Sequence, residues 1–190
     1  MSIAKNYTTQ NDLLLNNLLD FYKNDDNLTK MLNVINGESI ISQRIVDWFA
    51  TNYAKKYFTL YNIVNKNGET IRFKVYFDYK LKLKAYSKRR FDPFCRWNRI
   101  NIPYKNGTCI ETTIGQLNFF KWAIENKVID YIEQHYDVIE KDMKTRNSTS
   151  KKKEASTDTS NKTRKKREEL SISAAKSIKK EDVEIVVTFH

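Results

Sequence analysis

One short segment of the chain concentrates side chains whose types suit the binding of a polyanion. Residues 84–100, KAYSKRRFDPFCRWNRI, interleave cations with aromatic rings, and Asp92 is the only acid among them. Arg and Lys neutralise phosphates, while Tyr, Phe and Trp stack on unpaired bases. The combination predicts contact with nucleic acid. The cations that we expect to make this contact are Lys84, Lys88, Arg89, Arg90, Arg96 and Arg99.

The aromatic residues of this segment have a second interpretation. Phe91, Phe94 and Trp97 recur at every third position, and Pro93 lies between the first two. Such spacing can also place three rings in the core at a turn and leave the arginines outside. We expect the rings to be mostly buried and the cations to be exposed and to bind phosphate. A cationic face that is merely solvated is the alternative.

A second group of cations lies near the C-terminus. Residues 144–180 contain 13 Lys and Arg against 4 Asp and Glu, so they account for +9 of the total charge of +11. Such one-sided charge indicates a polyanionic partner, which is nucleic acid, an anionic membrane surface or an acidic protein. Two clusters here resemble a bipartite nuclear import signal or a nucleic-acid arm: Lys151, Lys152, Lys153, then Arg164, Lys165, Lys166 and Arg167.

Common catalytic motifs are missing from the sequence. It contains no phosphate-binding loop, no dinucleotide-binding glycine motif, no zinc-protease motif and no serine-hydrolase motif. Cys95 and Cys109 are the only cysteines, and with His135 and His190 they give no zinc-ligand spacing, so we expect two free thiols. We predict a protein without a catalytic site, a metal or a cofactor.

One enzymatic alternative remains in the sequence. Asp78-Tyr79-Lys80 would end a strand that Glu69 begins, and some metal-dependent nucleases place Mg²⁺ and a lysine on a hairpin in this way. An acid followed two positions later by a lysine also arises by chance in a Lys-rich strand. A solvated strand end is therefore the simpler interpretation.

The elements that must position these residues follow from hydrophobic periodicity. Helical spacing predicts helices over residues 10–23, 28–35 and 39–53, with Gly37 and Ser39 as caps. Alternation predicts strands over 57–64 and 70–86, joined by a hairpin at Asn67-Gly68, and a second hairpin around Asn106-Gly107. Beyond Tyr79 the pattern also fits a helix. Thr113 and Gln116 form a capping-box motif before two further helical runs, 117–124 and 128–143.

These elements predict an α+β fold for residues 1–143, with N-terminal helices, one antiparallel sheet of about three to five strands and a C-terminal pair of helices. Residues 144–172 have almost no apolar side chains to bury, so burial cannot offset the entropy that ordering them would cost. We therefore expect a disordered basic linker. Residues 173–190 should form a helix and strand segment. Its strand, residues 183–189, would pair with the domain's own sheet, with another copy or with another protein.

Four phrases of the sequence resemble a known family. They are GESIISQRIVDWFATNYAKK, KAYSKRRFDPFCR, ETTIGQLNFFKWAIENKVIDYI and the closing KKREELSISAAKSI with VEIVVTFH. Together they resemble small proteins encoded by nucleocytoplasmic large DNA viruses, the giant-virus and iridovirus group, over residues 37–143 and 164–190. The resemblance implies a viral origin and a role in the virion or at the site of replication. It brings no catalytic residues with it.

We therefore expect a non-enzymatic viral protein that contacts DNA or RNA, without marked sequence preference. It would act in the virion or in the virus factory of the host cytoplasm, with the host nucleus as an alternative. A component of viral assembly with no direct role on nucleic acid is the second interpretation. No apolar run approaches the roughly 20 residues of a membrane span, so we expect no such span.

Overall fold

The structure is a computed structural model that describes residues 9–64, 67–97, 99–104, 108–155 and 179–182, without the side chains at 108, 147–155 and 179–182. Its helices are α1 (Gln10–Tyr22), α2 (Asp25–Asn36), α3 (Gln43–Trp48), the π-helix η1 (Phe49–Tyr53), α4 (Ala54–Lys56), α5 (Val75–Phe91), α6 (Ile114–Glu125), α7 (Val128–Gln134) and α8 (Tyr136–Ala155). Its strands are β1 (Leu60–Val64), β2 (Thr70–Lys74), β3 (Arg99–Pro103), β4 (Thr108–Thr113) and β5 (Lys179–Asp182).

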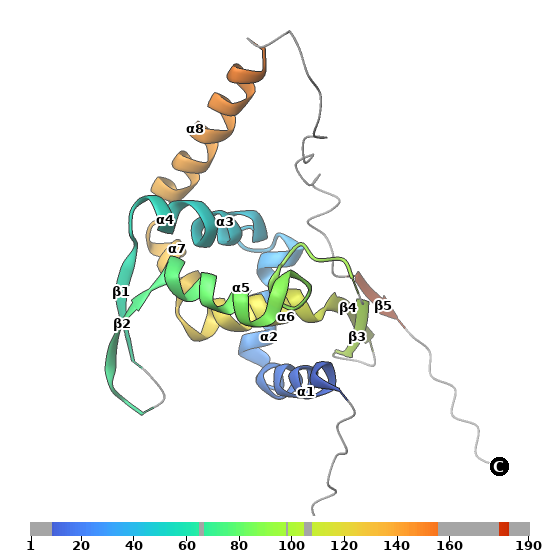
Figure 1. Cartoon of the computed structure of the whole chain (residues 1–190). Helices are drawn as coiled ribbons and strands as arrows, with labels where there is room; N and C mark the ends of the chain where they lie inside the picture. Colours follow the sequence, from blue (N-terminus) through green and yellow to red (C-terminus); the bar gives the residue numbers. More distant parts are fainter. Residues whose placement is uncertain (1–8, 65–66, 98, 105–107, 156–178, 183–190) are drawn as a thin grey trace, which may run out of the picture.

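The strands form two separate sheets at opposite ends of the domain (Figure 1). β1 and β2 are an antiparallel hairpin, and β3, β4 and β5 are an antiparallel sheet with β4 in the middle. The α+β class is confirmed, whereas the expected single sheet is wrong. The two sheets lie apart because a helix, α5, follows β2 directly and carries the chain across the domain (Figure 1).

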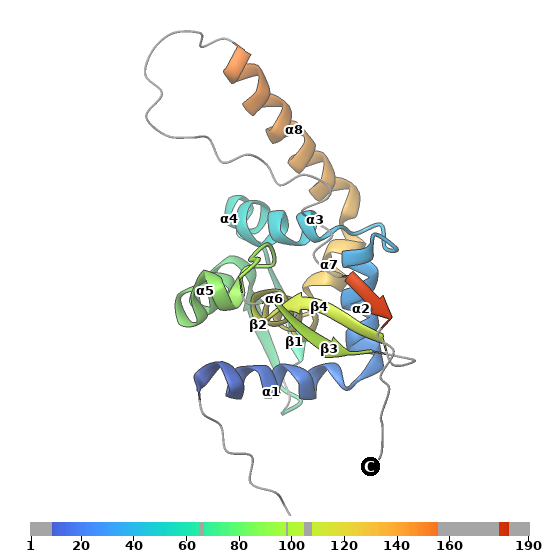
Figure 2. The same cartoon turned by 90° about the vertical axis from the view of Figure 1, so that its right-hand side faces the viewer.

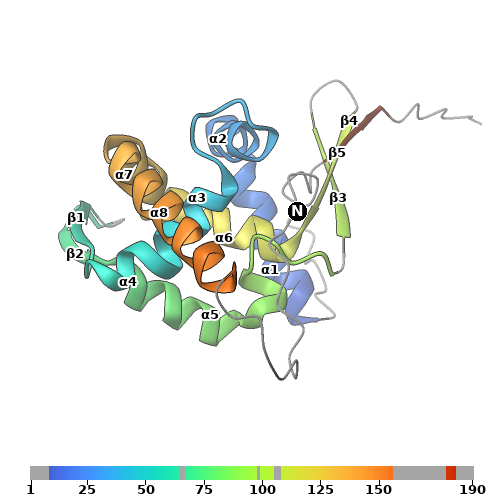
Figure 3. The same ribbon diagram turned by 90° about the horizontal axis from the view of Figure 1, so that it is seen from above.

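Helix α6 lies at the centre of the fold (Figures 2 and 3). It packs against α1, α2, α5, α7 and β4. A helix surrounded in this way must be apolar on all sides or have its polar groups satisfied. In α6 the rings of Phe119, Phe120 and Trp122 are buried, and the Tyr22 hydroxyl donates a hydrogen bond of 2.7 Å to the Leu117 carbonyl.

Local sequence signals set most of the helix ends. Gly37 ends α2 with a φ of 76°, the left-handed conformation that glycine adopts without steric cost. The Thr113 hydroxyl accepts a hydrogen bond from the Gln116 amide and so caps α6 as predicted. Ser39 was expected to cap the third helix, but α3 begins later, after Ser42, whose hydroxyl accepts from the Ile45 amide.

The predicted strand over residues 70–86 is correct only for its first residues. β2 ends at Lys74, and residues 75–91 form α5. Alternation placed Phe77 on a buried face, yet its side chain is 60 % exposed. Val75 and Tyr79, one helical turn apart, are buried, as is Phe91 at the end of the helix. Packing against α6 therefore favours a helix over the strand that the alternating pattern indicates.

The C-terminal helices extend beyond the boundary that composition indicates. The two predicted helical runs are separate, since α6 ends at its C-cap Asn126 before α7 and α8 follow. α8 continues to Ala155 and projects from the body of the domain, so the first part of the expected linker 144–172 is helical (Figure 1). Residues 156–172 lie outside the described residues.

The chain near its C-terminus returns to the domain. β5 pairs antiparallel with β4, with Asp182 opposite Thr108 and Lys179 opposite Glu111. The expected terminal strand, residues 183–189, lies outside the described residues. The segment directly before it adds an edge strand to the domain's own sheet.

One buried carboxylate anchors α8 to the body of the domain. Asp142 accepts hydrogen bonds from Trp48 Nε1 (3.3 Å), Lys56 Nζ (2.8 Å) and the Tyr57 hydroxyl (3.1 Å). Its side chain is only 7 % exposed. Burial alone would raise the pKa of Asp142, but these hydrogen bonds outweigh burial and hold the pKa below its usual value.

A depressed pKa makes a testable contribution to stability. The contribution is fully present above about pH 3.9, the pKa of an aspartate in the unfolded chain. It is lost as the pH falls through the lower pKa that Asp142 has in the folded state. We expect Asp142→Asn to lower the free energy of unfolding at neutral pH. We also expect the difference from the parent to shrink below about pH 4. Denaturant unfolding across this pH range measures it.

The matched control is another aspartate that pairs with a lysine. Asp20 lies 2.6 Å from Lys23 Nζ, but its side chain is 65 % exposed. Exposed pairs contribute little because solvent screens them. Asp20→Asn should therefore leave the stability nearly unchanged at every pH. An Asp142→Asn protein with the same pH profile as this control would contradict the anchoring role.

Candidate nucleic-acid interface

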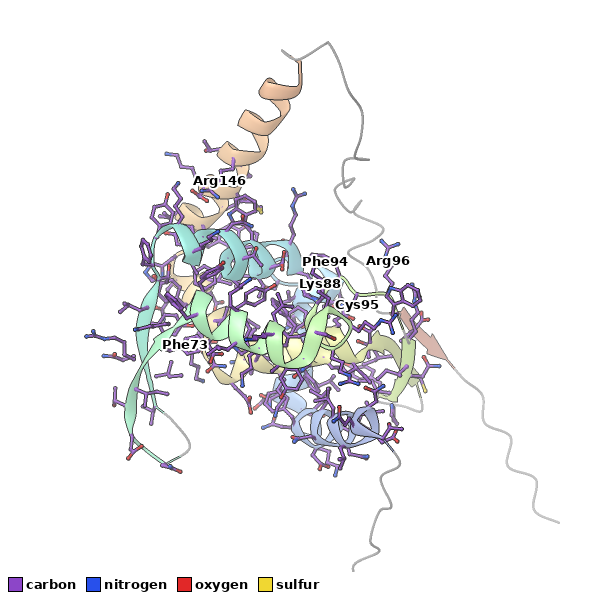
Figure 4. All side chains as sticks on the ribbon, in the orientation of Figure 1. Phe73, Lys88, Phe94, Cys95, Arg96 and Arg146 are labelled. Atoms are coloured by element: carbon purple, nitrogen blue, oxygen red, sulfur yellow. The ribbon has the colours of Figure 1, made fainter. Side chains whose placement is uncertain are left out.

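The structure places the cations of residues 84–100 along the second half of α5, on the link after it and on β3. Lys84, Lys88 and Arg89 are exposed on α5, and Arg96 is exposed on the link that leads to β3. Figure 4 places Lys88, Phe94, Cys95 and Arg96 together at the C-terminal end of α5, with Arg96 pointing away from the domain. We call Lys84, Lys88, Arg89 and Arg96 the α5 basic surface.

These four cations differ from the other two predicted ones in their partners. Within the described residues no ion pair involves a cation of the α5 basic surface. Arg90 is partly buried and donates to Gln10 Oε1 at 3.5 Å. Arg99 forms an ion pair of 2.9 Å with Glu111 across β3 and β4. Arg90 and Arg99 therefore have polar partners within the protein, while the cations of the α5 basic surface form no ion pair in the described part of the chain.

The aromatic rings of the segment do not share one environment. Phe91 is fully buried, Phe94 is partly buried and Trp97 is 65 % exposed. The expectation that the rings are mostly buried is therefore wrong for Trp97. The reason is that α5 ends at Phe91, so the residues after it no longer follow a helical period. The guanidinium of Arg89 lies over the exposed Trp97 ring, 5.3 Å from its centroid.

A relay of buried amides fixes the link after α5. The Thr112 hydroxyl donates to Gln116 Oε1 (2.9 Å), Gln116 Nε2 donates to Gln43 Oε1 (2.9 Å), and Gln43 Nε2 donates to the Pro93 carbonyl (2.8 Å). Gln116 and Gln43 are 0 % and 2 % exposed. Buried amides are stable only when they are paired, so the relay holds the Pro93 backbone in one place.

Two further contacts bind the end of α5 to the start of α6. Asn118 Nδ2 donates 2.8 Å to the Arg90 carbonyl. Gly115 lies so close to the link that a Cβ there would be 3.0 Å from the carbonyl oxygens of both Arg89 and Asp92. Glycine is therefore the residue that permits this packing.

The link also has an internal turn. Asp92 Oδ1 accepts from the Phe94 amide at 2.9 Å, and its carbonyl accepts from the Cys95 amide at 3.0 Å. Such side-chain-to-backbone bonding is typical of aspartate in turns. The single acid of the segment therefore shapes the turn that presents Arg96 and Trp97.

A strained residue interrupts α5 within the basic segment. Ser87 has φ 62° and ψ 168°, a region that residues other than glycine rarely occupy. Such a conformation costs about 1–3 kcal/mol and persists where the surroundings enforce it. The kink separates the last turn of α5, which carries Lys88 and Arg89, from the turns that carry Lys84.

The residues of the nuclease alternative do not form a strand end. Asp78 and Lys80 lie within α5, and Asp78 accepts a hydrogen bond of 2.6 Å from Trp122 Nε1. Throughout the described part of the chain there is no group of three or more His, Cys, Asp or Glu residues placed to hold a metal ion. Cys95 and Cys109 are free thiols.

The structure describes less of the predicted C-terminal cations. Lys151, Lys152 and Lys153 lie in α8, in the part whose side chains are not described. Arg164, Lys165, Lys166 and Arg167 lie outside the described residues. Among the described helices none is long and apolar enough to cross a bilayer.

Sequence reasoning missed the residues that position the interface. Gln116 and Asn118 are polar residues in α6, a helix that is otherwise mostly apolar and buried, and this was the available signal. Gln43, the first residue of α3, gave no such signal. Gly115 is one of only 4 glycines in the chain and lies inside a helix, where glycine is unfavourable. Both signals show that a residue has a special environment, but neither indicates its partner.

Comparison with known proteins identifies relatives of this chain. The model of DUF7197, a family of unknown function, matches residues 2–189. A curated relative, uncharacterized protein L507 of Acanthamoeba polyphaga mimivirus, is 52 % identical over 128 residues, which are 65 % of this chain and 49 % of the relative. The chain thus spans about half the length of that relative. No solved structure matches the chain. The chain belongs to DUF7197, a family of unknown function that includes proteins of giant viruses.

Proposed function

We propose that this protein is a non-enzymatic viral protein that binds DNA or RNA through the α5 basic surface. The observation that carries the proposal is the set of exposed cations, Lys84, Lys88, Arg89 and Arg96, without an ion pair in the described part of the chain. A cation held near an acid gains little from a phosphate, whereas an unpaired one can release condensed counterions. The contact would be made with the backbone, so it would have little sequence preference.

The C-terminal cations are the second part of the proposal. Residues 144–180 hold most of the net charge, and an arm of this composition strengthens binding without fixing its register. The site of action that we propose is the virion or the virus factory in the host cytoplasm, with import to the host nucleus through the two basic clusters as the alternative. The mimivirus relative supports the viral origin on which this proposal depends.

Neutralising part of the α5 basic surface tests the proposal. We expect Lys84→Gln, Lys88→Gln and Arg96→Gln together to weaken binding of a labelled DNA duplex, measured by fluorescence anisotropy. Each phosphate contact removed should flatten the log–log dependence of affinity on salt by about 0.9. The thermal midpoint should stay close to that of the parent, because these side chains are exposed and form no ion pair in the described part of the chain.

The control removes the same charge elsewhere. Arg72 and Lys74 on β2 and Lys141 on α8 are exposed and lie away from the α5 basic surface. Replacing these three with Gln gives a protein of equal net charge. It should bind the duplex more tightly, and with a steeper salt dependence, than the first variant. Equal losses in both variants would show that total charge and not this surface controls binding.

A protein-assembly role is the second candidate, because α5 exposes apolar side chains on its surface. Phe77 and Leu81 are 60 % and 65 % exposed and line a surface recess with Lys80, Leu83 and Lys84. Exposed apolar residues with a polar rim are typical of protein contacts. Self-association that Phe77→Ser and Leu81→Ser abolish, in a protein that does not bind nucleic acid, would favour this candidate.

A further inference from the structure

We infer that the interface binds unpaired nucleic acid, with one base stacked on Trp97. This inference rests on the proposed function and adds the form of nucleic acid. It begins from the contrast between Trp97 and the other two tryptophans. Trp122 is 3 % exposed and donates to Asp78, and Trp48 donates to Asp142. Trp97 is 65 % exposed, and its indole N–H has no acceptor among the described residues.

The Trp97 ring has one covered face and one open face. The guanidinium of Arg89 lies over the ring, 5.3 Å from its centroid, so it covers one side. The residue as a whole is still 65 % exposed, so ring surface outside this contact meets solvent. A flat ring that is wetted on one face and backed by a cation on the other is a suitable platform for a nucleobase.

The backbone that leads to Trp97 is anchored before any ligand binds. The Pro93 carbonyl is bound by Gln43, and the turn at Asp92 fixes the amides of Phe94 and Cys95. Only a few residues separate these anchors from Trp97. A ring that is positioned in advance loses less freedom on binding than a mobile one, so more of the stacking energy contributes to affinity.

Charge and stacking together select the form of the nucleic acid. Lys88 and Arg96 are exposed and neighbour Arg89 and Trp97 in the sequence, and Figure 4 places both at the same end of α5. They can contact the phosphates that flank a stacked base. In a duplex each base is already stacked between its neighbours, so its faces are not available without unstacking. In a single strand the faces are free, and stacking of this kind tolerates any base. Trp97 therefore favours single strands, while the cations alone bind both forms.

Two labelled probes of equal length test the inference, an oligothymidylate and a blunt DNA duplex. We expect Trp97→Ala in the full chain to lower the affinity for the oligothymidylate about tenfold, the loss typical of one stacked base. Affinity for the duplex should change less than about twofold, because the phosphate contacts remain. Trp97→Phe should restore part of the single-strand affinity. The thermal midpoint of each variant should match the parent, since the side chain is exposed.

Intrinsic fluorescence gives an independent measurement. Binding of the oligothymidylate should quench the tryptophan emission of the parent, and Trp97→Phe should remove that quenching, because Trp122 is buried and Trp48 is engaged with Asp142. Equal losses on both probes, or an unchanged single-strand affinity in Trp97→Ala, would overturn the inference while leaving the proposed function intact. If neither probe binds the parent at low salt, the proposed function fails as well.

Discussion

Phe91→Ala is expected to lower the free energy of unfolding by about 3–5 kcal/mol, the range for loss of a buried phenyl ring. Phe91 is fully buried at the end of α5. Its ring lies 5.8 Å from those of Phe119 and Trp122, 5.9 Å from that of Tyr79 and 6.1 Å from that of Tyr86, measured between centroids. Truncation removes these contacts and leaves a cavity that the surrounding rings cannot fill. Chemical denaturation monitored by circular dichroism measures the loss.

Phe77→Ala is the matched control for this prediction. Phe77 lies on the same helix, but its side chain is 60 % exposed. Its truncation should change the stability by less than about 0.5 kcal/mol. If both variants lost the same amount, or if Phe91→Ala lost less than about 1 kcal/mol, the ring cluster would not be the core that joins α5 to α6.

Gly115→Ala is expected to destabilise the protein and to weaken nucleic-acid binding in one step. The new Cβ would lie 3.0 Å from the carbonyl oxygens of Arg89 and Asp92 and 3.3 Å from the Asp92 amide nitrogen. These are backbone atoms, which cannot rotate away as a side chain can. Overpacking of this kind costs about 1–3 kcal/mol. The link would have to shift, and Arg89, Arg96 and Trp97 would move with it.

The sign of this effect is informative because helix propensity predicts the opposite. Replacing glycine by alanine inside a helix gains up to about 1 kcal/mol where there is space for the methyl group. A rise in thermal midpoint for Gly115→Ala would therefore show that the link does not pack against α6 as described. Loss of stability with unchanged affinity for nucleic acid would show that the packing of Gly115 does not position the residues that bind nucleic acid.

Local signals in the sequence identified the elements whose ends they control. Gly37 ends α2, Thr113 caps α6, and the hairpin at Asn67-Gly68 joins β1 to β2. Each of these features depends on a few neighbouring residues and on backbone chemistry alone. Sequence inspection can therefore find them without knowledge of the tertiary structure.

The features that the sequence did not reveal depend on contacts between distant segments. Residues 75–79 alternate like a strand, but packing of Tyr79 and Phe91 against α6 favours a helix. The relay from Thr112 through Gln116 and Gln43 to Pro93 joins three separate parts of the chain. Neither periodicity nor composition contains such pairings.

The candidate interface was predicted in part for the same reason. The cations were identified from their density in the sequence, which needs no fold. The structure then separates Arg90 and Arg99, which have partners inside the protein, from the four unpaired cations of the α5 basic surface. The exposure of Trp97 depends on where α5 ends, so spacing alone could not give it.

The salt dependence of binding by the full chain is the most direct test of the central claim, that an unpaired cationic surface binds nucleic acid. Affinity for the oligothymidylate and for the duplex would be measured by anisotropy over a range of salt concentrations. The claim predicts a straight line when the logarithm of the affinity is plotted against the logarithm of the salt concentration. The slope should be about −0.7 per phosphate contact for the single strand and about −0.9 for the duplex. Absence of binding at low salt, or an affinity that salt does not change, would contradict it.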